Sequence, residues 1–467
     1  MKRSIPLIII EGATVMAVEL CGAKLMAPVF GGSLFVWAAI LAITLCALAL
    51  GYYIGGVLSS SEKLNNKLYQ IIVAASIFIA LMPFMAVYVL PYISYLNFKL
   101  AVLLSAFVLI FVPIFLLGCT TPLLIRINTH NAETAGLVSG KVYAISTIGG
   151  IVSTLLCGFI LIPFLGLKFT LLAFAILLLI TGVIVLKVFK INSSLILFVV
   201  VVFSAKLYAI SDAALYYKNG ILGEIDVVDL KEDNVRQLRI NKIVQTEMAL
   251  DTKLSTSIYV NMIDSLIPVQ SDRPKALVLG LGGGLVANLL ETKNYEVDAV
   301  EFDIRIIEAA KTYFLLHNSV ETYCEDARYF INTCDKTYDL IIFDLFKAEE
   351  QPSHTITMES LNKVKKMLSK DGLIIINWHG YIKEPLGAGT QILLNTLRQS
   401  QFEVETRSSS TQEDHSNTLI IARRSELVPQ LSSVTVNIDD VPILELANAK
   451  ANLRWRVNYL RYYQGKK

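Results

Sequence analysis

Long apolar stretches dominate the first 211 residues of this 467-residue chain, and no other feature constrains its fold as strongly. Only four of the 39 acidic residues occur there, so the other thirty-five fall in the remaining 256 positions. A helix crosses the hydrocarbon core of a bilayer, which is about 30 Å thick, with about 20 apolar residues. The sequence therefore predicts two unlike parts: an N-terminal α-helical multi-span membrane domain over residues 1–211, and a soluble C-terminal part.

Seven stretches are long and apolar enough to be membrane spans. They lie near residues 5–29, 34–58, 70–91, 98–119, 139–163, 168–188 and 193–211. The second, LFVWAAILAITLCALALGYYIGG, ends in small residues that favour close helix packing. Glu11 and Glu19 stand on one side of the first expected helix, and an acid inside a membrane is a functional candidate. The alternative is that Glu11 lies near the interface and that Glu19 pairs with Lys24 or a polar group of another helix.

The soluble part alternates β-rich runs with helical segments. After a small β region at residues 212–255 come the runs KALVLG, EVDAVEFD, VETYCED, YDLIIFDLF and GLIIINW. Apolar runs separated by helical segments such as IRIIEAAKTYFLL are typical of an α/β doubly wound sheet that is covered on both faces. Such sheets bind ligands at the carboxyl ends of their strands, so we expect a ligand-binding catalytic domain over residues 256–467.

Residues at the strand ends predict a nucleoside site. Glycines after the first strand let the backbone approach a ligand. An acid ending the second strand can accept two hydrogen bonds from a ribose diol, and acids ending the third are within reach of an adenine amino group. These residues are, in order, Gly280, Gly282 and Gly284, then Glu301, and then Glu325 and Asp326. Exposed acids without a ligand are the alternative interpretation.

Asp344 ends the fourth strand, where the reacting end of such a ligand should lie. Its carboxylate could take a proton from an amine or orient the amine, and the alternative is a helix N-cap or a loop acid. His379, in NWHG, is the second candidate base, with a buried or loop histidine as the alternative. The six cysteines show no metal-ligand spacing and are expected as buried thiols, and we assign no metal. A net charge of +2 excludes an electrostatic footprint for nucleic acid.

The soluble part is similar to the spermidine synthase family, the aminopropyltransferases on the class I methyltransferase (Rossmann-like) fold. The segments that carry the resemblance are LRINKIVQTEMALD, VLGLGGGLVA, VEFDIRIIEAA, CEDARYF and YDLIIFDLF. The whole chain resembles the membrane-fused branch of that family, because APVFGGSLFVWAAILAITLCALALGYYIGG, FLLGCTTPLL and GKVYAISTIGGIVSTLLCGFILIPFLG are similar to its spans.

The resemblance implies transfer of an aminopropyl group from decarboxylated S-adenosylmethionine to an amine such as putrescine, with release of methylthioadenosine. The nucleoside would be a co-substrate rather than a permanently bound cofactor. The resemblance further implies Glu301 on the ribose, Asp326 near the adenine, Gln245 near the reacting groups and Asp344 facing the amine. The implied partners are a small-molecule amine and the lipid bilayer, and a homo-oligomer is a further option.

Three departures from the family pattern leave other functions open. Leu285 replaces the acid of GGGDG, Lys347 replaces the second acid of D-x-x-D-P, and YHEM reads YVNM at residues 259–262. These positions receive cationic amines in the family. The alternatives are an S-adenosylmethionine-dependent methyltransferase, and a transporter or sensor that binds a polyamine or nucleoside without turnover.

Lys and Arg in short loops indicate the cytoplasmic side of a membrane protein. Here Lys and Arg occur in or beside every second loop: Lys2 and Arg3, Lys63 and Lys67, Arg126 and Lys141, and Lys187 and Lys190. The N-terminus is therefore expected inside, and seven spans would place the C-terminal domain outside, although its nucleoside is cytoplasmic. Either the stretch 193–211 does not span, or an earlier stretch does not. A multi-pass protein of the cell membrane with a cytoplasmic catalytic domain is the expectation.

Overall fold

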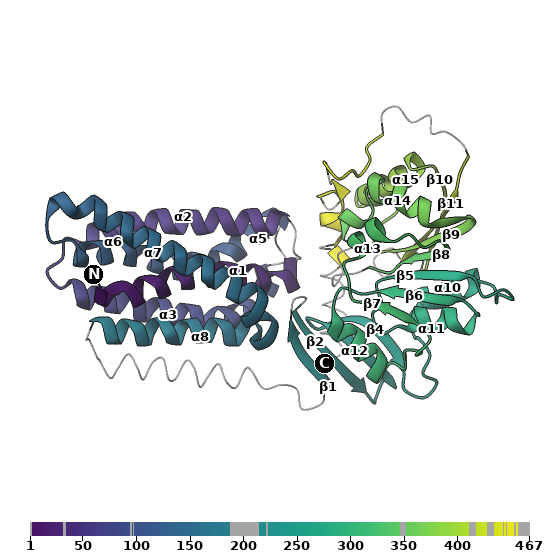
Figure 1. Cartoon of the computed structure of the whole chain (residues 1–467), viewed down its shortest axis with the longest axis horizontal. Coiled ribbons are helices and arrows are strands. Elements are labelled where there is room, and N and C mark those ends of the chain that lie inside the picture. The colour runs from purple at the N-terminus through teal and green to yellow at the C-terminus, as the bar shows by residue number, and fades with distance from the viewer. Residues whose placement is uncertain are drawn as a thin grey trace. The chain divides into compact units, whose positions relative to one another are not determined.

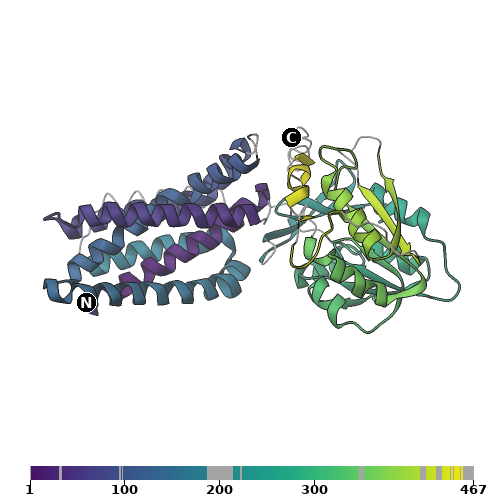
Figure 2. The ribbon, with the colours of Figure 1, turned by 90° about the horizontal axis from the view of Figure 1, so that it is seen from above.

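The computed structural model consists of two compact units. It describes residues 2–30, 34–93, 96, 98–186, 214–220, 223–345, 352–410, 417–426, 434–441, 443–444, 446–452 and 454–455. Met1–Asp212 with Asn219–Gly223 form the first, which we call the helical unit, and Ala213–Lys218 with Glu224–Lys467 form the second, the α/β unit. Figures 1 and 2 show the helices and strands of both units.

The helical unit is made of long apolar helices that lie alongside one another (Figure 2). Its α-helices are α1 (Ile5–Phe30), α2 (Leu34–Leu58), α3 (Leu64–Tyr88), α4 (Leu90–Ile93), α5 (Phe98–Ala106), α6 (Val112–Asn128), α7 (Ala135–Leu156) and α8 (Ile162–Leu186). Single π-helical turns, Phe107–Phe111 and Cys157–Leu161, join α5 to α6 and α7 to α8.

Small residues bring α2 and α6 into close contact, as the sequence predicts. A Cβ atom on Gly51 would lie 2.5 Å from the carbonyl oxygen of Phe115, and one on Gly55 would lie 2.5 Å from that of Cys119. No larger residue fits at either crossing, so the two glycines allow the backbones of α2 and α6 to approach each other. The α1 helix packs along α7 and α8, and α3 packs along α6 and α8.

Five helices in the described residues are long and apolar enough to cross a membrane. The last of them runs from Ala132 to Leu186 and includes both stretches that the sequence predicts as separate spans, 139–163 and 168–188. Within it Gly166 has non-helical backbone angles (φ 76°, ψ 170°), so the helix is interrupted between the two stretches. The seventh predicted stretch, 193–211, lies outside the described residues.

The interior of the helical unit holds polar contacts around Glu11. The Thr121 hydroxyl on α6 donates to Oε1 of Glu11 at 3.0 Å, and the Ser146 hydroxyl on α7 donates to Oε2 at 2.9 Å. Glu11 is thus buried and hydrogen-bonded to two other helices. Glu19 is also buried, on the same helix.

The α/β unit contains two sheets (Figure 1). The smaller has the order β1 (Ala214–Gly220), β2 (Gly223–Leu230), β3 (Val235–Ile240) and β4 (Ile243–Ala249), and the pairs β2–β3 and β3–β4 are antiparallel. The larger has the order β10-β11-β9-β8-β5-β6-β7. Its strands are β5 (Lys275–Leu279), β6 (Glu296–Val300), β7 (Glu321–Tyr323), β8 (Tyr338–Phe343), β9 (Leu368–Trp378), β10 (Phe402–Ser408) and β11 (Thr418–Arg424).

The larger sheet confirms the predicted class I methyltransferase-like fold. Strands β5 to β9 are parallel, and β11 and β10 add an antiparallel pair at one edge. The strand order reverses beside β5, and a ligand crevice forms where the order of an open sheet reverses. The apolar β-rich runs predict the doubly wound sheet, because each strand of a sheet that is covered on both faces is apolar on both sides.

Alternate side chains of the central strands pack into two separate hydrophobic cores, one on each face of the sheet. Leu277 and Leu279 of β5 pack with helices α13 (Ala327–Thr333), α14 (Met358–Met367) and α15 (Ala388–Gln399). Ala276 and Val278 pack with α10 (Ile258–Leu266), α11 (Leu285–Thr292) and α12 (Ile304–Tyr313) on the other face. The side chains of a strand alternate between faces, so a sheet covered twice requires this continuous apolar run.

The prediction of buried thiols is wrong for two of the six cysteines. Cys46 and Cys324 are exposed, whereas Cys21, Cys119 and Cys157 are buried. Cys46 lies on α2 next to Leu45, which is 67% exposed, so the apolar face that carries it is an outer face of the helical unit. An apolar stretch therefore does not predict a buried side chain when the helix itself has an apolar exterior.

Candidate active site

The site begins at the glycine turn after β5. Gly280, Gly282 and Gly284 have positive φ angles of 92°, 52° and 78°, which other residues rarely adopt. A Cβ atom on Gly280 would lie 2.2 Å from the carbonyl oxygen of Asp344, so only glycine lets the ends of β5 and β8 meet. Gly284 is the N-cap of α11, and the N–H of Gly283 donates to the Thr246 hydroxyl at 2.8 Å.

Glu301 lies directly beneath this turn. Its Oε2 accepts a hydrogen bond from the backbone N–H of Leu281 at 3.2 Å, and its Oε1 accepts one from that of Asp303 at 3.0 Å. Burial raises the pKa of Glu301, and the backbone donors act in the opposite direction. A carboxylate oxygen has more than one lone pair, so both oxygens can accept further hydrogen bonds from a diol.

The acids that end β7 differ in their surroundings. Oδ1 of Asp326 accepts the backbone N–H groups of Arg328 (2.8 Å) and Tyr329 (3.1 Å) and so caps α13. Its Oδ2 lies 3.8 Å from Nε2 of His354. Glu325 is half-buried, and its backbone N–H donates to the carbonyl of Glu301 at 3.1 Å. Asp326 thus has a structural role as an N-cap, which the sequence analysis did not consider for this residue, and a second oxygen that faces away from the helix.

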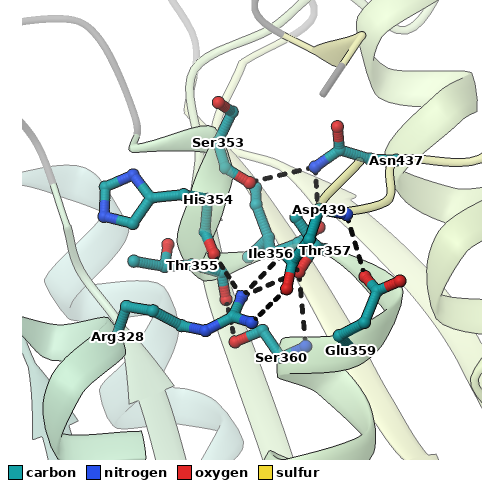
Figure 3. A network of polar contacts seen from close by, with 10 residues as sticks. All are labelled: Arg328, Ser353, His354, Thr355, Ile356, Thr357, Glu359, Ser360, Asn437 and Asp439. Carbon is teal, nitrogen blue, oxygen red and sulfur yellow. Dashed lines mark hydrogen bonds and ion pairs between the residues drawn. The ribbon is translucent and has the colours of Figure 1, made fainter. Parts of the chain in front are cut away.

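A polar network fixes the chain beside Asp326 (Figure 3). Arg328 forms an ion pair with Asp439 at 2.6 Å and donates to the Thr357 hydroxyl at 2.8 Å. Thr357 also donates to Asp439 at 2.7 Å, and Asn437 donates to the carbonyl of Ser353 at 2.9 Å. The segment around Asn437 and Asp439 therefore holds the start of α14 against the start of α13.

Asp344 follows β8 and is held by two neutral donors. The Tyr259 hydroxyl on α10 donates to its Oδ2 at 3.0 Å, and the Asn377 amide at the end of β9 donates to its Oδ1 at 2.8 Å. Burial raises the pKa of Asp344, and these two bonds act against that rise. Burial and the nearby Asp344 also raise the pKa of Tyr259 well above its usual value, so this hydroxyl remains a donor. No positive charge is bonded to Asp344 among the described residues.

Two other predicted residues, His379 and Gln245, have different surroundings. The ring of His379 lies tilted by 31° against that of Trp455 with 5.0 Å between centroids, and burial lowers the pKa of His379 to about 4. Gln245 lies in β4, where its amide is 3.4 Å from the carbonyl oxygens of Ile243 and Val244. The structure therefore groups the glycine turn, Glu301 and Asp344 at one edge of the sheet. Lys347 is outside the described residues.

The family profile described as "Spermine/spermidine synthase domain" matches residues 256–386. Residues 256–386 are thus similar to the spermine/spermidine synthase domain. The match starts just before α10 and ends after β9, so it includes the glycine turn, Glu301 and Asp344.

Three known proteins are similar to parts of this chain. The polyamine aminopropyltransferase of Vibrio vulnificus (strain CMCP6) is 32% identical over 126 residues, which are 26% of this chain and 42% of that protein. The N-terminal histidine N-methyltransferase of Emericella nidulans is 32% identical over 121 residues, 25% of this chain and 22% of that protein. The polyamine aminopropyltransferase 2 of Aquifex aeolicus (strain VF5) is 25% identical over 376 residues, 76% of this chain and 74% of that protein. The chain thus spans less than half the length of the first two relatives.

Several residues around the spermine/spermidine synthase domain were missed by sequence reasoning. In the sequence, Tyr259 is marked only by the YVNM departure, and Asn377 only by its place in the apolar run GLIIINW. A buried amide at the carboxyl end of a strand is a usable signal, because buried polar groups need partners. Thr246 and Asn417 lie outside the matched range, and nothing in their local sequence marks them.

Proposed function

We propose that the α/β unit is an aminopropyltransferase-like enzyme that uses decarboxylated S-adenosylmethionine and an amine acceptor. The observation that carries the proposal is the position of Asp344, a buried acid with two neutral donors, against the glycine turn. Glu301, beneath the same turn, would bind the ribose diol, and Oδ2 of Asp326, the oxygen that lies 3.8 Å from Nε2 of His354, would lie towards the adenine. The synthase domain and the two relatives named polyamine aminopropyltransferase support this reading and indicate a transferase.

The reaction would be a direct displacement at carbon. The lone pair of the amine nitrogen attacks the methylene carbon bonded to the sulfonium, the carbon–sulfur bond breaks, and methylthioadenosine leaves with the electron pair. Positive charge is lost at sulfur and appears on nitrogen, so the enzyme contributes mainly by holding the two reactants in line. An amine has a pKa near 10 and must lose a proton to react, and Asp344 would accept that proton.

The acceptor is proposed to be an amine of the putrescine class or one with fewer charges. Asn261 is exposed and Leu285 is buried at the positions where the family carries acids. A single carboxylate, Asp344, then remains to attract the reacting amine among the residues that we place in the site. An acceptor with one ammonium group would fit this arrangement without leaving a second charge unpaired.

We further infer that the helical unit anchors the enzyme in the cell membrane and that the α/β unit faces the cytoplasm. Large apolar side chains on the exterior of the helices support the anchor, such as Phe159, which is 76% exposed. A soluble surface rarely carries many such side chains side by side. The cytoplasmic side follows from where the nucleoside is made.

A methyltransferase is the second candidate. The likeness to the N-terminal histidine N-methyltransferase and the loss of acids at Leu285 and Asn261 favour it. Ordinary S-adenosylmethionine would use the same glycine turn and Glu301. The two co-substrates differ in one carboxylate, which S-adenosylmethionine has and decarboxylated S-adenosylmethionine lacks.

Calorimetric titration of the full-length protein in detergent would test the proposal. We expect methylthioadenosine and decarboxylated S-adenosylmethionine to bind more tightly than S-adenosylmethionine, and mass spectrometry to detect methylthioadenosine when an amine is added. Preferential binding of S-adenosylmethionine with formation of S-adenosylhomocysteine would establish the methyltransferase instead. Binding of a nucleoside without any product from a panel of mono- and diamines would contradict both enzymes.

A further inference from the structure

The orientation of the Asn377 side chain determines whether a hydrogen-bond donor or an acceptor faces the Asp344 carboxylate. An amide can present either its N–H₂ or its oxygen to a neighbour, and the two differ by a rotation of 180° about one bond. Here Nδ2 of Asn377 donates to Oδ1 of Asp344 at 2.8 Å. The reversed amide would place its oxygen against the carboxylate, and only a protonated Asp344 could then form the hydrogen bond.

Asn417 determines which of these orientations is favourable. Its Nδ2 donates to Oδ1 of Asn377 at 2.8 Å, so the oxygen of Asn377 is drawn away from Asp344. Asn417 is itself fixed by Ser409, because its backbone N–H donates to the Ser409 hydroxyl at 2.8 Å and its carbonyl accepts the Ser409 N–H at 2.8 Å. These bonds extend the β10–β11 pairing by one residue pair at the end where the chain passes from β10 to β11, which gives Asn417 a defined position.

The donors of Asn417 and Asn377 follow one another in the same direction. Nδ2 of Asn417 donates to Oδ1 of Asn377, and Nδ2 of Asn377 donates to Oδ1 of Asp344. The two amides therefore form a chain of hydrogen bonds that ends at Asp344.

We propose that Asn417 is a positioning residue that holds the Asn377 amide with its N–H₂ group towards Asp344 and so keeps this carboxylate ionised and aimed for proton transfer. The inference rests on the proposed function for its catalytic meaning. No proton travels along the amides. Hydrogen bonds in such a chain polarise one another in the same direction, which strengthens the last bond. The residues that touch Asp344 directly are Tyr259 and Asn377.

Two variants of Asn417 separate orientation from packing. Asn417→Asp keeps the shape but can only accept, so Asn377 would turn its N–H₂ group towards residue 417 and its oxygen towards Asp344. Asn417→Leu removes the bond without favouring the reversed amide. We expect the acid limb of the pH–rate profile to rise by about 1–2 pH units in Asn417→Asp, the equivalent of one hydrogen bond to a charged group, and by less in Asn417→Leu.

The matched control is Gln270→Leu. This variant also removes one amide donor from a side-chain hydrogen bond, the bond from Gln270 to the Tyr295 hydroxyl at 3.0 Å. Gln270 precedes β5, whereas the glycine turn and the Asp344 site follow the carboxyl ends of β5 and β8. This variant should leave the profile unchanged. In every variant the affinity for methylthioadenosine should stay within about threefold, because no nucleoside contact is altered. A purely structural role of Asn417 would lower the stability of both variants and tolerate the isosteric Asp better than Leu.

A second measurement does not depend on turnover. The infrared band of the protonated Asp344 carboxyl group can be isolated during acid titration by subtracting, for each full-length protein, the spectrum of the same protein that also carries Asp344→Asn. Its midpoint should rise in the order wild type, Asn417→Leu, Asn417→Asp. Equal midpoints in all three proteins would overturn the inference, whether or not the protein transfers an aminopropyl group. A raised midpoint in a protein that forms no product from any amine would keep the positioning role and reject the proposed reaction.

Discussion

Replacing Asp344 by Asn should suppress turnover while sparing nucleoside binding. The structure accommodates this change, because Oδ1 of the new amide can accept from Asn377 as the carboxylate does. The Tyr259 hydroxyl, which donates to Asp344 at 3.0 Å, can rotate and accept from the new N–H₂ group. Both contacts survive, so the substitution removes one charge and one proton acceptor without opening a cavity.

The expected loss in kcat is about 10²–10⁴-fold at neutral pH, the usual contribution of a positioned base. This corresponds to about 2.7–5.5 kcal/mol of transition-state stabilisation. Burial raises the pKa of Asp344 and brings it closer to that of the amine, which makes it a stronger base than an exposed aspartate. At pH 7 about one amine in a thousand is neutral, given a pKa near 10, and the variant would depend on that fraction.

The assay is methylthioadenosine formation by the full-length protein between about pH 6 and pH 9.5. The deficit of the variant should shrink about tenfold for each pH unit, because the neutral amine becomes more abundant. Calorimetry with methylthioadenosine should give the wild-type affinity. A methyl transfer to an acceptor that needs no deprotonation would show a smaller loss without recovery at high pH. Turnover within about threefold of wild type at every pH and with every accepted amine would refute the assignment of Asp344.

Three further outcomes are expected. Glu301→Ala should weaken methylthioadenosine binding by about 10²–10⁴-fold in calorimetry, because two hydrogen bonds to a charged group would be lost; unchanged affinity in a folded variant would exclude the ribose contact. Arg328→Leu should lower the free energy of unfolding by about 1–2 kcal/mol in urea titrations near pH 7, at the low end because Asp439 is 42% exposed. Partial burial would raise the pKa of Asp439, but the bonds from Thr357 and Arg328 outweigh it and lower this pKa. The difference between the proteins should therefore begin to shrink only below about pH 4, the usual pKa of an aspartate, and should fall further as the pH passes through the lowered pKa of the folded protein. A difference that shrinks already between about pH 7 and pH 5 would count against this origin. A thiol reporter placed just beyond Ser211 should be labelled only from the cytoplasmic side of sealed vesicles, and labelling from the other side would remove the enzyme reading unless the nucleoside is exported.

The sequence predicts the architecture well because burial leaves a regular signal. The apolar runs of β5, β6, β8 and β9 are required by a sheet covered on both faces, and the helical segments between them have one apolar side. The interruption at Gly166 falls between the two stretches predicted as separate spans, 139–163 and 168–188, although the glycine alone is compatible with a continuous helix as well as with a break. The apolar helices likewise hide which side chains face outwards, as Cys46 shows.

The sequence predicts individual strand-end residues but not their partners. The glycine turn, Glu301 and Asp344 follow from strand ends that a parallel sheet brings to one edge. Tyr259 and Asn417 contribute from 85 residues before Asp344 and from 40 residues after Asn377, and no local pattern connects such positions. Asp326 shows a different limit, since an N-cap and a ligand contact require the same residue type at the same place.

The late segment of the chain that closes the α/β unit has a consequence for biosynthesis. The carbonyl of Asn437 accepts the first N–H of α14, from Met358, and Trp455 covers the ring of His379. A ribosome adds about 5–20 residues per second, so these residues emerge several seconds or more after the apolar helices. The nascent protein would therefore be inserted before α14 and the end of β9 acquire their last contacts. Translation that stops short of Asn437 should leave a chain that reaches the membrane but exposes the apolar side of α14, which is the kind of surface that chaperones and proteases bind.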